Sequence, residues 1–235
     1  MLPVAILAGG LATRLLPITQ TLPKALVTIG GVPFIERQLR YLKSQGASQV
    51  VLCVSHLGER IQSVVSDGSR FGLDVRYSYD GPLRLGTGGA VQKALPLLGD
   101  AFFVLYGDSY LPIEYGPVEA AFKRSGRPAL MTVLKNEQRW DRSNVEYRHD
   151  GVVVEYNKHR ARPDMTYIDY GLSVLTPRAL AGYPANEPLD LADVYHNLSI
   201  AGELAGYEVC ERFYEIGSHQ GLDETEKYFS RQEAQ

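Results

Sequence analysis

The first half of the chain alternates short apolar runs with segments of helical periodicity. The apolar runs, which are typical of buried strands, cover residues 4–8, 50–54, 73–77 and 101–106. Segments in which apolar residues recur at helical spacing cover residues 34–45, 59–65 and 90–98. Pro96 is expected to end or bend the last of these helices. Strands that alternate with helices predict right-handed βαβ units, and therefore a mostly parallel sheet with helices on both faces.

The second half shows a different pattern, in which β-type runs follow one another with few helices between them. These runs cover residues 129–134, 144–147, 151–156 and 168–175. They predict mixed or antiparallel strands that extend the sheet and form a wall over it. Helical patterns follow at 189–201 and 218–229, and Asp190 with Asp193 favours a cap of the first helix over a metal site with His196. The sequence predicts one α/β domain over residues 1–235, with a Rossmann-like sheet and a small mixed or antiparallel extension.

Composition and charge narrow the partners of this domain. The net charge is −3 and 22% of the residues are charged, so we expect no basic surface for nucleic acid and only a few placed cations for phosphate. We find no signal sequence and no apolar stretch of the ~18–20 residues that a membrane helix needs. Cys53 and Cys210 lack metal-type spacing, and Cys53 is expected to be a buried, reduced thiol. A soluble cytoplasmic protein without membrane partners is the expectation.

Two predicted strands end in residues suited to phosphate and metal chemistry. Gly9 and Gly10 follow the first strand, where glycines let backbone N–H groups approach an anion closely. Arg14 adds a planar group with several donors, and Lys24 adds a second cation. Asp108 follows the strand at 101–106, and ligands of parallel sheets bind at such strand ends. The missing Gly-Lys-Ser/Thr excludes a Walker A loop, and the missing Gly-x-Gly-x-x-Gly disfavours a dinucleotide-binding domain.

The loops at residues 7–19 and 23–26 carry a family resemblance. They read Leu-Ala-Gly-Gly-Leu-Ala-Thr-Arg-Leu-Leu-Pro-Ile-Thr and Pro-Lys-Ala-Leu. This combination resembles the signature of sugar-1-phosphate nucleotidyltransferases, roughly Gly-Gly-x-Gly-Thr-Arg-Leu-x-Pro-x-Thr followed by Pro-Lys-Pro. Ala12 and Ala25 stand where that family has glycine and proline. Further matches are Leu-Gly-Thr-Gly-Gly-Ala at 85–90, Gly-Asp at 107–108, Glu-Tyr-Asn-Lys at 155–158, Tyr-Gly at 170–171 and Tyr-Glu-Ile-Gly-Ser at 214–218.

The resemblance implies roles for individual residues, with a nucleotide-binding half at 1–110 and a sugar-phosphate-binding half at 111–235. Nucleotide contacts are implied for Ala8, Gly9, Gly10, Thr13, Arg14, Gly86, Thr87, Gly88 and Gly89. Sugar-phosphate contacts are implied for Lys24, Asn144, Glu155, Lys158, Tyr170 and Gly171. Arg14, Lys24 and Asp108 are implied to be catalytic, and Asp108 and Glu215 to bind Mg²⁺, a hard cation that prefers carboxylate oxygens. Asn157 and Glu215 depart from the acidic residue and the aspartate of the family.

The resemblance also implies a GT-A-like fold and a reaction, in which an NTP and a sugar 1-phosphate give an NDP-sugar and pyrophosphate. GTP with a heptose- or mannose-type 1-phosphate is the preferred pair, and UTP or dTTP with a hexose or muramate 1-phosphate is the alternative. A catalytically silent relative that binds nucleotide sugars is a second alternative. Members of the family often form dimers or tetramers, which leaves a homo-oligomer as a family expectation.

Overall fold

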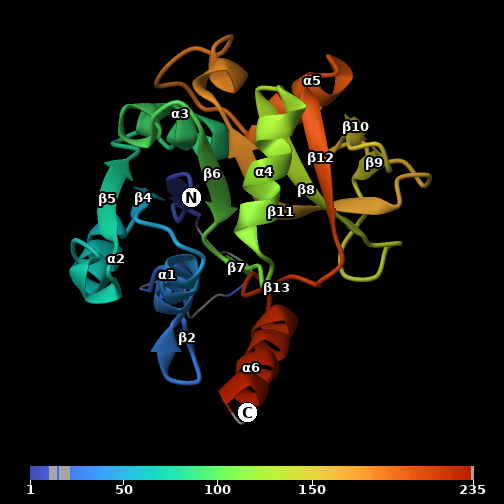
Figure 1. Ribbon diagram of the computed structural model, residues 1–235. Helices are drawn as coiled ribbons and strands as arrows, with labels where there is room; N and C mark the ends of the chain where they lie inside the picture. The colour runs from blue at the N-terminus through green and yellow to red at the C-terminus, as the bar shows by residue number, and fades with distance from the viewer. Residues whose placement is uncertain (11–14, 16–21, 234–235) are drawn as a thin grey trace.

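A nine-stranded sheet forms the centre of the computed structural model, which describes residues 1–10, 15 and 22–233 (Figure 1). The strands follow the spatial order β5, β4, β1, β6, β11, β8, β12, β10, β9. Their bounds are β1 Val4–Leu7, β4 Gln49–Val54, β5 Asp74–Tyr79, β6 Phe102–Tyr106, β8 Ala129–Lys135, β9 Val145–Arg148, β10 Val152–Tyr156, β11 Tyr167–Leu175 and β12 Leu204–Val209.

The strands of the first half, β5, β4, β1 and β6, are parallel to one another. Both faces of this part of the sheet are buried, because Val4 and Ile6 of β1 pack into one core cluster and Ala5 packs into another. A strand that is covered on both faces reads as a continuous apolar run, which explains the pattern at residues 4–8. Leu7 pairs with Tyr106, so the carboxyl ends of β1 and β6 lie side by side.

The strands of the second half form the mixed extension that the sequence predicts. Strand β11 is antiparallel to both β6 and β8, whereas β12 is parallel to β8. The hairpin of β9 and β10 completes the sheet, and Val145 of β9 also pairs with Tyr167 of β11. The sheet therefore curls over at this end, as Figure 1 shows, and the predicted α/β fold class is confirmed.

Helices cover both faces of the sheet. One core cluster receives side chains from α1 (Phe34–Ser44), α2 (Gly58–Val65) and α4 (Tyr115–Ser125). The other receives them from α3 (Gly86–Leu98) and α5 (Leu191–Ile200). Within the part of the chain that the structure describes, none of the helices is long and apolar enough to cross a membrane.

The last helix, α6 (His219–Glu233), packs against a small hairpin of β2 (Thr28–Ile29) and β3 (Val32–Pro33) (Figure 1). A two-stranded ribbon connects α6 to the main sheet, because β7 (Ser109–Tyr110) pairs antiparallel with β13 (Tyr214–Glu215). The backbone N–H of Ile216 donates to the carbonyl of Asp108 at 2.9 Å. The ribbon thus brings the segment around Glu215 to the carboxyl end of β6.

Several elements differ from the prediction, and the short strands β2, β3, β7 and β13 were not predicted. Helix α3 begins at Gly86 and runs through Pro96 to Leu98, because a proline in the last turn removes only one backbone donor. Helix α4 was not predicted; it buries Tyr115, Val118 and Phe122, and Gly116 and Pro117 lie in its first turn. Strand β12 was not predicted either, and its burial is complete only at its two ends.

Candidate active site

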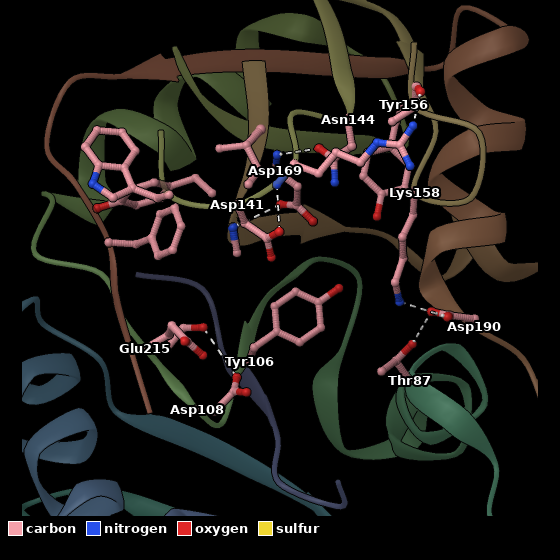
Figure 2. Close-up of a pocket in the computed structure, with 18 residues that line it drawn as sticks. Thr87, Tyr106, Asp108, Asp141, Asn144, Tyr156, Lys158, Asp169, Asp190 and Glu215 are labelled. Atoms are coloured by element: carbon pink, nitrogen blue, oxygen red, sulfur yellow. Dashed lines mark hydrogen bonds and ion pairs between the residues drawn. The ribbon is translucent and has the colours of Figure 1, made fainter. Parts of the chain in front are cut away.

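Two adjoining cavities open at the carboxyl ends of the strands. We call the first, of about 330 Å³, the glycine-lined cavity; Gly9, Gly10 and Gly86 line it beside apolar residues. We call the second, of about 410 Å³, the polar cavity, because carboxylates, Asn144 and Lys158 line it (Figure 2). Thr87 and Tyr106 line both cavities, so the two spaces meet at these residues.

The glycine-lined cavity is formed largely by backbone and small side chains. Gly9 follows β1, and its carbonyl accepts a hydrogen bond of 2.7 Å from the Ser55 hydroxyl. A Cβ added to Gly10 would have no described atom within 4 Å, so the face of Gly10 toward the cavity is open. Leu7, Cys53 and Ala90 add an apolar floor, and burial raises the pKa of the Cys53 thiol to about 12, which keeps it protonated. Such a surface suits a flat, mostly apolar group that is recognised through main-chain atoms.

The glycines at the start of α3 have a packing role as well as a lining role. The N–H groups of Gly88 and Gly89 donate to the carbonyl of Leu189 at 2.8 and 3.2 Å. A Cβ on Gly86 would lie 2.6 Å from that same carbonyl oxygen, and Gly86 has a φ of +69°. Gly88 and Gly89 do not line either cavity, and neither does Ala8. The structure therefore brings Gly9, Gly10, Gly86 and Thr87 of the predicted nucleotide set to one cavity.

Asp80 is a carboxylate in the glycine-lined cavity that was not predicted from the sequence. It follows β5, and its side chain accepts one long hydrogen bond, 3.4 Å, from the N–H of Leu85. Burial raises the pKa of Asp80, and this outweighs the opposing effects of the Leu85 N–H, Lys93 and Arg84. No ion pair of Asp80 is found among the described residues. Its carboxylate oxygens are therefore acceptors with room for a ligand.

Asp108 and Lys24 form an ion pair at the edge of the polar cavity. The Lys24 ammonium donates to the Asp108 carboxylate at 2.5 Å, and the side chain of Asp108 is 31% exposed. Asp108 is the second residue after β6, and its carboxylate faces the cavity in Figure 2. Lys24 lies in a short 3₁₀ helix, Lys24–Leu26, that begins after Pro23. Both residues were assigned to the reacting centre from the sequence, and the structure brings them into contact.

Glu215 lines the polar cavity on the same side as Asp108 (Figure 2). Its two carboxylate oxygens accept hydrogen bonds from the Gly217 N–H at 2.7 Å and the Ser218 hydroxyl at 2.9 Å. Both donors lie directly before α6, so the Glu215 carboxylate accepts hydrogen bonds from the segment that leads into that helix. Each carboxylate oxygen has a second lone pair, so this contact leaves Glu215 able to accept another ligand.

Lys158 lies on the opposite side of the polar cavity, where it contacts Asp190. Its ammonium donates to the Asp190 carboxylate at 3.2 Å. Asp190 also caps α5, as predicted, by accepting the Ala192 N–H at 3.0 Å, and it accepts the Thr87 hydroxyl at 2.8 Å. Burial raises the pKa of Asp190, but the Ala192 N–H, Thr87 and Lys158 together lower it below its ordinary value. Asp190 is therefore ionised at neutral pH.

The remaining predicted sugar-phosphate residues divide into two groups. Asn144, Tyr170 and Gly171 line the polar cavity. Glu155 does not line it, because its carboxylate is bound by the Asn157 amide and by the Arg162 guanidinium. These two hydrogen bonds lower the pKa of Glu155, which marks it as a partner in a local charge network.

Further side chains line the polar cavity without having been predicted as site residues, and among them are Trp140, Asp141, Arg142 and Asp169. Burial raises the pKa of Asp169 to about 6, against the effects of the Gly171 N–H and Lys158. The sequence offered one signal for Asp169, since it lies directly before the Tyr-Gly pair at 170–171.

Trp140, Asp141 and Arg142 belong to a loop whose shape depends on a buried residue. The amide of Asn136, which is 0% exposed, donates to the Asp141 carbonyl at 2.7 Å and to the Ser143 hydroxyl at 2.9 Å. The same side chain accepts the Trp140 N–H at 3.2 Å. Such local hydrogen bonds hold the loop in one conformation. No periodic pattern marks a loop of this kind, so the sequence offered no basis for finding it.

Thr13 and Arg14 lie outside the residues that the structure describes, so their predicted roles stay predictions. The metal role of Asp108 and Glu215 likewise stays a prediction. Within the described chain, no group of three or more metal-type side chains could hold an ion by itself. A cation at this place would depend on ligand oxygens as well, as is usual for Mg²⁺.

Comparison with known proteins identifies the family of this chain. The sequence pattern of the nucleotidyl transferase family matches residues 4–154. The chain belongs to this family. The match includes the β1 loop, the start of α3 and Asp108, and it ends before Lys158, Asp169 and Asp190.

Several curated members of the nucleotidyl transferase family are similar to this chain. A D-glycero-alpha-D-manno-heptose 1-phosphate guanylyltransferase from Campylobacter jejuni is 38% identical over 154 residues, which are 65% of this chain and 66% of that protein. An N-acetylmuramate alpha-1-phosphate uridylyltransferase from Neisseria meningitidis is 28% identical over 94% of this chain and 95% of its own length. A UTP–glucose-1-phosphate uridylyltransferase from Synechocystis is 29% identical over 84% of this chain, and the match spans 55% of that protein.

Solved structures of the family share the fold. HddC from Yersinia pseudotuberculosis, in complex with GMP-PN, superposes with a TM-score of 0.81 at 24% identity over 97% of this chain and 100% of that chain. The inositol-1-phosphate CTP transferase from T. maritima gives a TM-score of 0.78 at 21% identity over 98% of this chain and 95% of that one. The mixed α/β architecture is therefore that of the nucleotidyl transferases.

Proposed function

We propose that this nucleotidyl transferase is a sugar-1-phosphate nucleotidyltransferase, which joins an NTP to a sugar 1-phosphate and releases pyrophosphate. The observation that carries the proposal is the junction of the two cavities at Thr87 and Tyr106, with Asp108 and Lys24 beside it. A nucleotide in the glycine-lined cavity and a sugar phosphate in the polar cavity would meet at this junction. The family match and the guanylyl- and uridylyltransferase relatives support the same reaction class.

The residues at the junction fit a magnesium ion. Asp108 and Glu215 supply hard oxygen donors on one side of the cavity, brought there by the pairing of β7 with β13. The ion pair of Asp108 with the Lys24 ammonium at 2.5 Å supports a cation-binding role for this carboxylate. Bound Mg²⁺ would neutralise negative charge on the substrate phosphates. Asp108 and Glu215 are therefore the residues that we propose to hold it.

The chain's own side chains have a positioning and charge-balancing task in this reaction. The second pKa of a phosphate monoester is about 6, so the attacking oxygen of a sugar 1-phosphate is already ionised at neutral pH. A general base is therefore not required, and the chief difficulty is to bring two anions together. We assign Lys158, which lines the polar cavity, to the sugar phosphate, and Lys24, which pairs with Asp108, to phosphate at the junction. Arg14 is proposed to stabilise the leaving pyrophosphate.

Pyrophosphate release tests this proposal. Wild-type protein would be incubated with each of five NTPs against a panel of sugar 1-phosphates, with Mg²⁺ and with a chelator. We expect release for one matched pair of substrates, and its loss when the chelator removes the metal. Tight nucleotide binding without release for any pair would instead favour a silent nucleotide-sugar-binding relative. The hydrogen bonds that occupy Glu215 at the entry to α6 are the observation that keeps this second candidate in view.

We propose GTP as the nucleotide, because Asp80 presents a carboxylate in the glycine-lined cavity. An ionised carboxylate only accepts hydrogen bonds. Guanine offers two adjacent donors, N1–H and the N2 amino group, which a carboxylate can accept together. Uracil and thymine offer a single N3–H between two carbonyl oxygens, and these oxygens would repel the carboxylate. The 38% identity to the Campylobacter guanylyltransferase supports this choice, whereas the full-length match to the Neisseria enzyme keeps UTP as the alternative.

Inosine triphosphate gives a direct test of the base, because it is GTP without the N2 amino group. We expect wild-type protein to prefer GTP to ITP and to UTP, and Asp80→Asn to lose most of the preference for GTP over ITP. A lost interaction with a charged partner typically costs ~1.5–3 kcal/mol, or roughly 10–150-fold in kcat/KM. Asp67→Asn is the matched control, since Asp67 is an exposed acceptor for the Ser69 N–H and lines neither cavity. Equal use of GTP and ITP by the wild type would contradict the role of Asp80.

For the sugar, we propose a neutral, polyhydroxylated heptose- or mannose-type 1-phosphate. Asp141, Asn144 and Asp169 line the polar cavity with oxygen acceptors that suit sugar hydroxyl groups. The same carboxylates would repel a sugar that carries its own carboxylate. Comparison of mannose 1-phosphate with N-acetylmuramate 1-phosphate in the pyrophosphate assay tests this choice.

A further inference from the structure

A chain of three side chains connects the two cavities, and the reaction proposed above does not by itself require it. Thr87 lies in the first turn of α3, Asp190 caps α5, and Lys158 follows β10. The Thr87 hydroxyl donates to one Asp190 carboxylate oxygen at 2.8 Å, and the Lys158 ammonium donates to the other at 3.2 Å. Figure 2 shows the three residues in a row at one side of the polar cavity.

The Thr87 end of this chain is fixed from two sides. Its hydroxyl accepts the N–H of Leu191 at 2.8 Å while it donates to Asp190. The segment around it is also tied to Leu189, whose carbonyl accepts the N–H groups of Gly88 and Gly89. The position of the Asp190 carboxylate is therefore set by the same segment that forms one wall of the glycine-lined cavity.

Stability alone does not account for the contact between Asp190 and Lys158. The two side chains are 38% and 54% exposed, and ion pairs at such sites contribute little to folding free energy. The cap of α5 is already satisfied by the Ala192 N–H, without Lys158. What the pair does achieve is to hold the end of a long, flexible side chain at one place on the wall of the polar cavity. Because an ammonium has three donors, two remain for a ligand.

We propose that Asp190 is a positioning residue for the sugar 1-phosphate. Its carboxylate holds the Lys158 ammonium at the phosphate, and the Thr87 hydroxyl fixes the position of that carboxylate relative to the glycine-lined cavity. This inference rests on the proposed function, which assigns Lys158 to the sugar phosphate. One carboxylate thereby fixes the distance between the two substrate sites. Losing the lysine's orientation would weaken sugar-phosphate binding and leave nucleotide binding unchanged.

Charge repulsion alone predicts the opposite effect of removing Asp190 on sugar-phosphate binding. A carboxylate near a phosphate binding site repels the phosphate, so removing Asp190 would improve binding if the residue did nothing for Lys158. Positioning predicts weaker binding, whereas simple charge repulsion predicts tighter binding. The direction of the change separates the two.

The test uses Asp190→Ser, because serine is also a good N-cap but is too short to reach Lys158. The full chain would be titrated with mannose 1-phosphate by calorimetry, and the KM values of both substrates would be measured by pyrophosphate release. We expect about tenfold weaker sugar-phosphate binding and a matching rise in its KM, with the KM of the NTP unchanged. Thr87→Val, which removes the hydroxyl and keeps the shape, is expected to change the same parameter in the same direction. Asp193→Ser is the matched control, because Asp193 lies on the same helix and pairs with the exposed His159.

A double-mutant cycle with Lys158→Ala shows whether Asp190 acts through the lysine. In the Lys158→Ala background, Asp190→Ser is expected to have no further effect on sugar-phosphate binding. Tighter binding of the sugar phosphate by Asp190→Ser would overturn the proposal. So would a further loss of binding when Asp190→Ser is added to Lys158→Ala, if that loss is as large as in the wild-type background. Calorimetric binding without any pyrophosphate release would refute the proposed function but still decide the role of Asp190. No detectable binding of mannose 1-phosphate or inorganic phosphate to the wild type would overturn the positioning role.

Discussion

The two cavities of this nucleotidyl transferase are built from different parts of the polypeptide. The glycine-lined cavity lies at the ends of parallel strands, and its walls include several glycines and apolar side chains, with Asp80 and Arg84 as charged residues. The polar cavity lies over the mixed part of the sheet and is lined by long and charged side chains, including Lys158, Asp169 and Asp190. Backbone shape together with the Asp80 carboxylate would select the ligand in the first cavity, and side-chain chemistry alone would do so in the second.

This difference has a consequence for how each cavity tolerates change. Main-chain walls depend on where glycines stand, so a single Cβ can alter them. Walls made of side chains can change their chemistry while the backbone stays in place. Variation among relatives that use different sugars is therefore expected in the polar cavity first.

The largest expected effect concerns Asp108, at the junction of the cavities. Asp108→Asn keeps the size of the side chain but removes the charge that faces Lys24 at 2.5 Å. Loss of one preorganised charge contact commonly costs on the order of 10²–10³ in rate, so we expect a loss of that size in kcat for pyrophosphate release. The fold should persist, because the side chain is 31% exposed. Asp150→Asn, an exposed aspartate paired with Arg148, serves as the control. Turnover near the wild-type value in Asp108→Asn would remove this residue from the reacting centre.

Two glycine substitutions separate packing from ligand contact in the glycine-lined cavity. Gly86→Ala is expected to lower the free energy of unfolding by ~1–3 kcal/mol, because its Cβ would meet the Leu189 carbonyl at 2.6 Å and its φ is +69°. Gly10→Ala is expected to leave stability unchanged, since no described atom lies within 4 Å of the new Cβ. Its effect should appear only as a raised KM for the NTP. Chemical denaturation and NTP titration measure the two effects, and a stable Gly10→Ala variant with wild-type KM would argue against nucleotide contact at this loop.

A smaller effect is expected from Asp169 in the polar cavity. Its folded-state pKa of about 6 lies above the ordinary value of 3.8, so the folded protein resists ionisation of this group. The resulting contribution to stability is present below pH ~4 and is lost as pH rises to about 6, with a total of ~1–2 kcal/mol after allowance for partial exposure. Asp169→Asn should therefore gain stability relative to the wild type between pH 4 and pH 7. Unfolding curves at both pH values provide the measurement, and a constant difference between the two proteins would contradict the raised pKa.

The same contrast explains how much could be predicted from the sequence. Glycine positions, strand ends and the residues after them follow local rules, so Gly9, Gly10, Gly86 and Asp108 were found from the pattern and the resemblance together. The polar cavity depends on residues that are distant in sequence and share no period. Asp169 and Asp190 come from different elements, and Trp140 and Arg142 come from a loop that Asn136 organises. Glu155 lies outside the lining of that cavity, because it pairs with Arg162, a partner that its motif did not reveal.

The function of the glycines at the start of α3 shows a second limit of sequence reasoning. The resemblance at 85–90 implies nucleotide contacts for Gly86, Thr87, Gly88 and Gly89. In the structure, Gly88 and Gly89 also make the close contact with Leu189, and the Thr87 hydroxyl binds Asp190. A motif can therefore be recognised correctly while part of its physical task lies in the packing of a distant segment.

The central claim is that nucleotide and sugar phosphate react where the two cavities meet, with attack at the α-phosphorus. The most direct measurement follows wild-type protein with GTP, mannose 1-phosphate and Mg²⁺ by ³¹P NMR. We predict that pyrophosphate and a nucleoside diphosphate sugar appear in equal amounts as both substrates disappear. Formation of orthophosphate with GDP, or binding of both substrates without any new signal, would contradict the account.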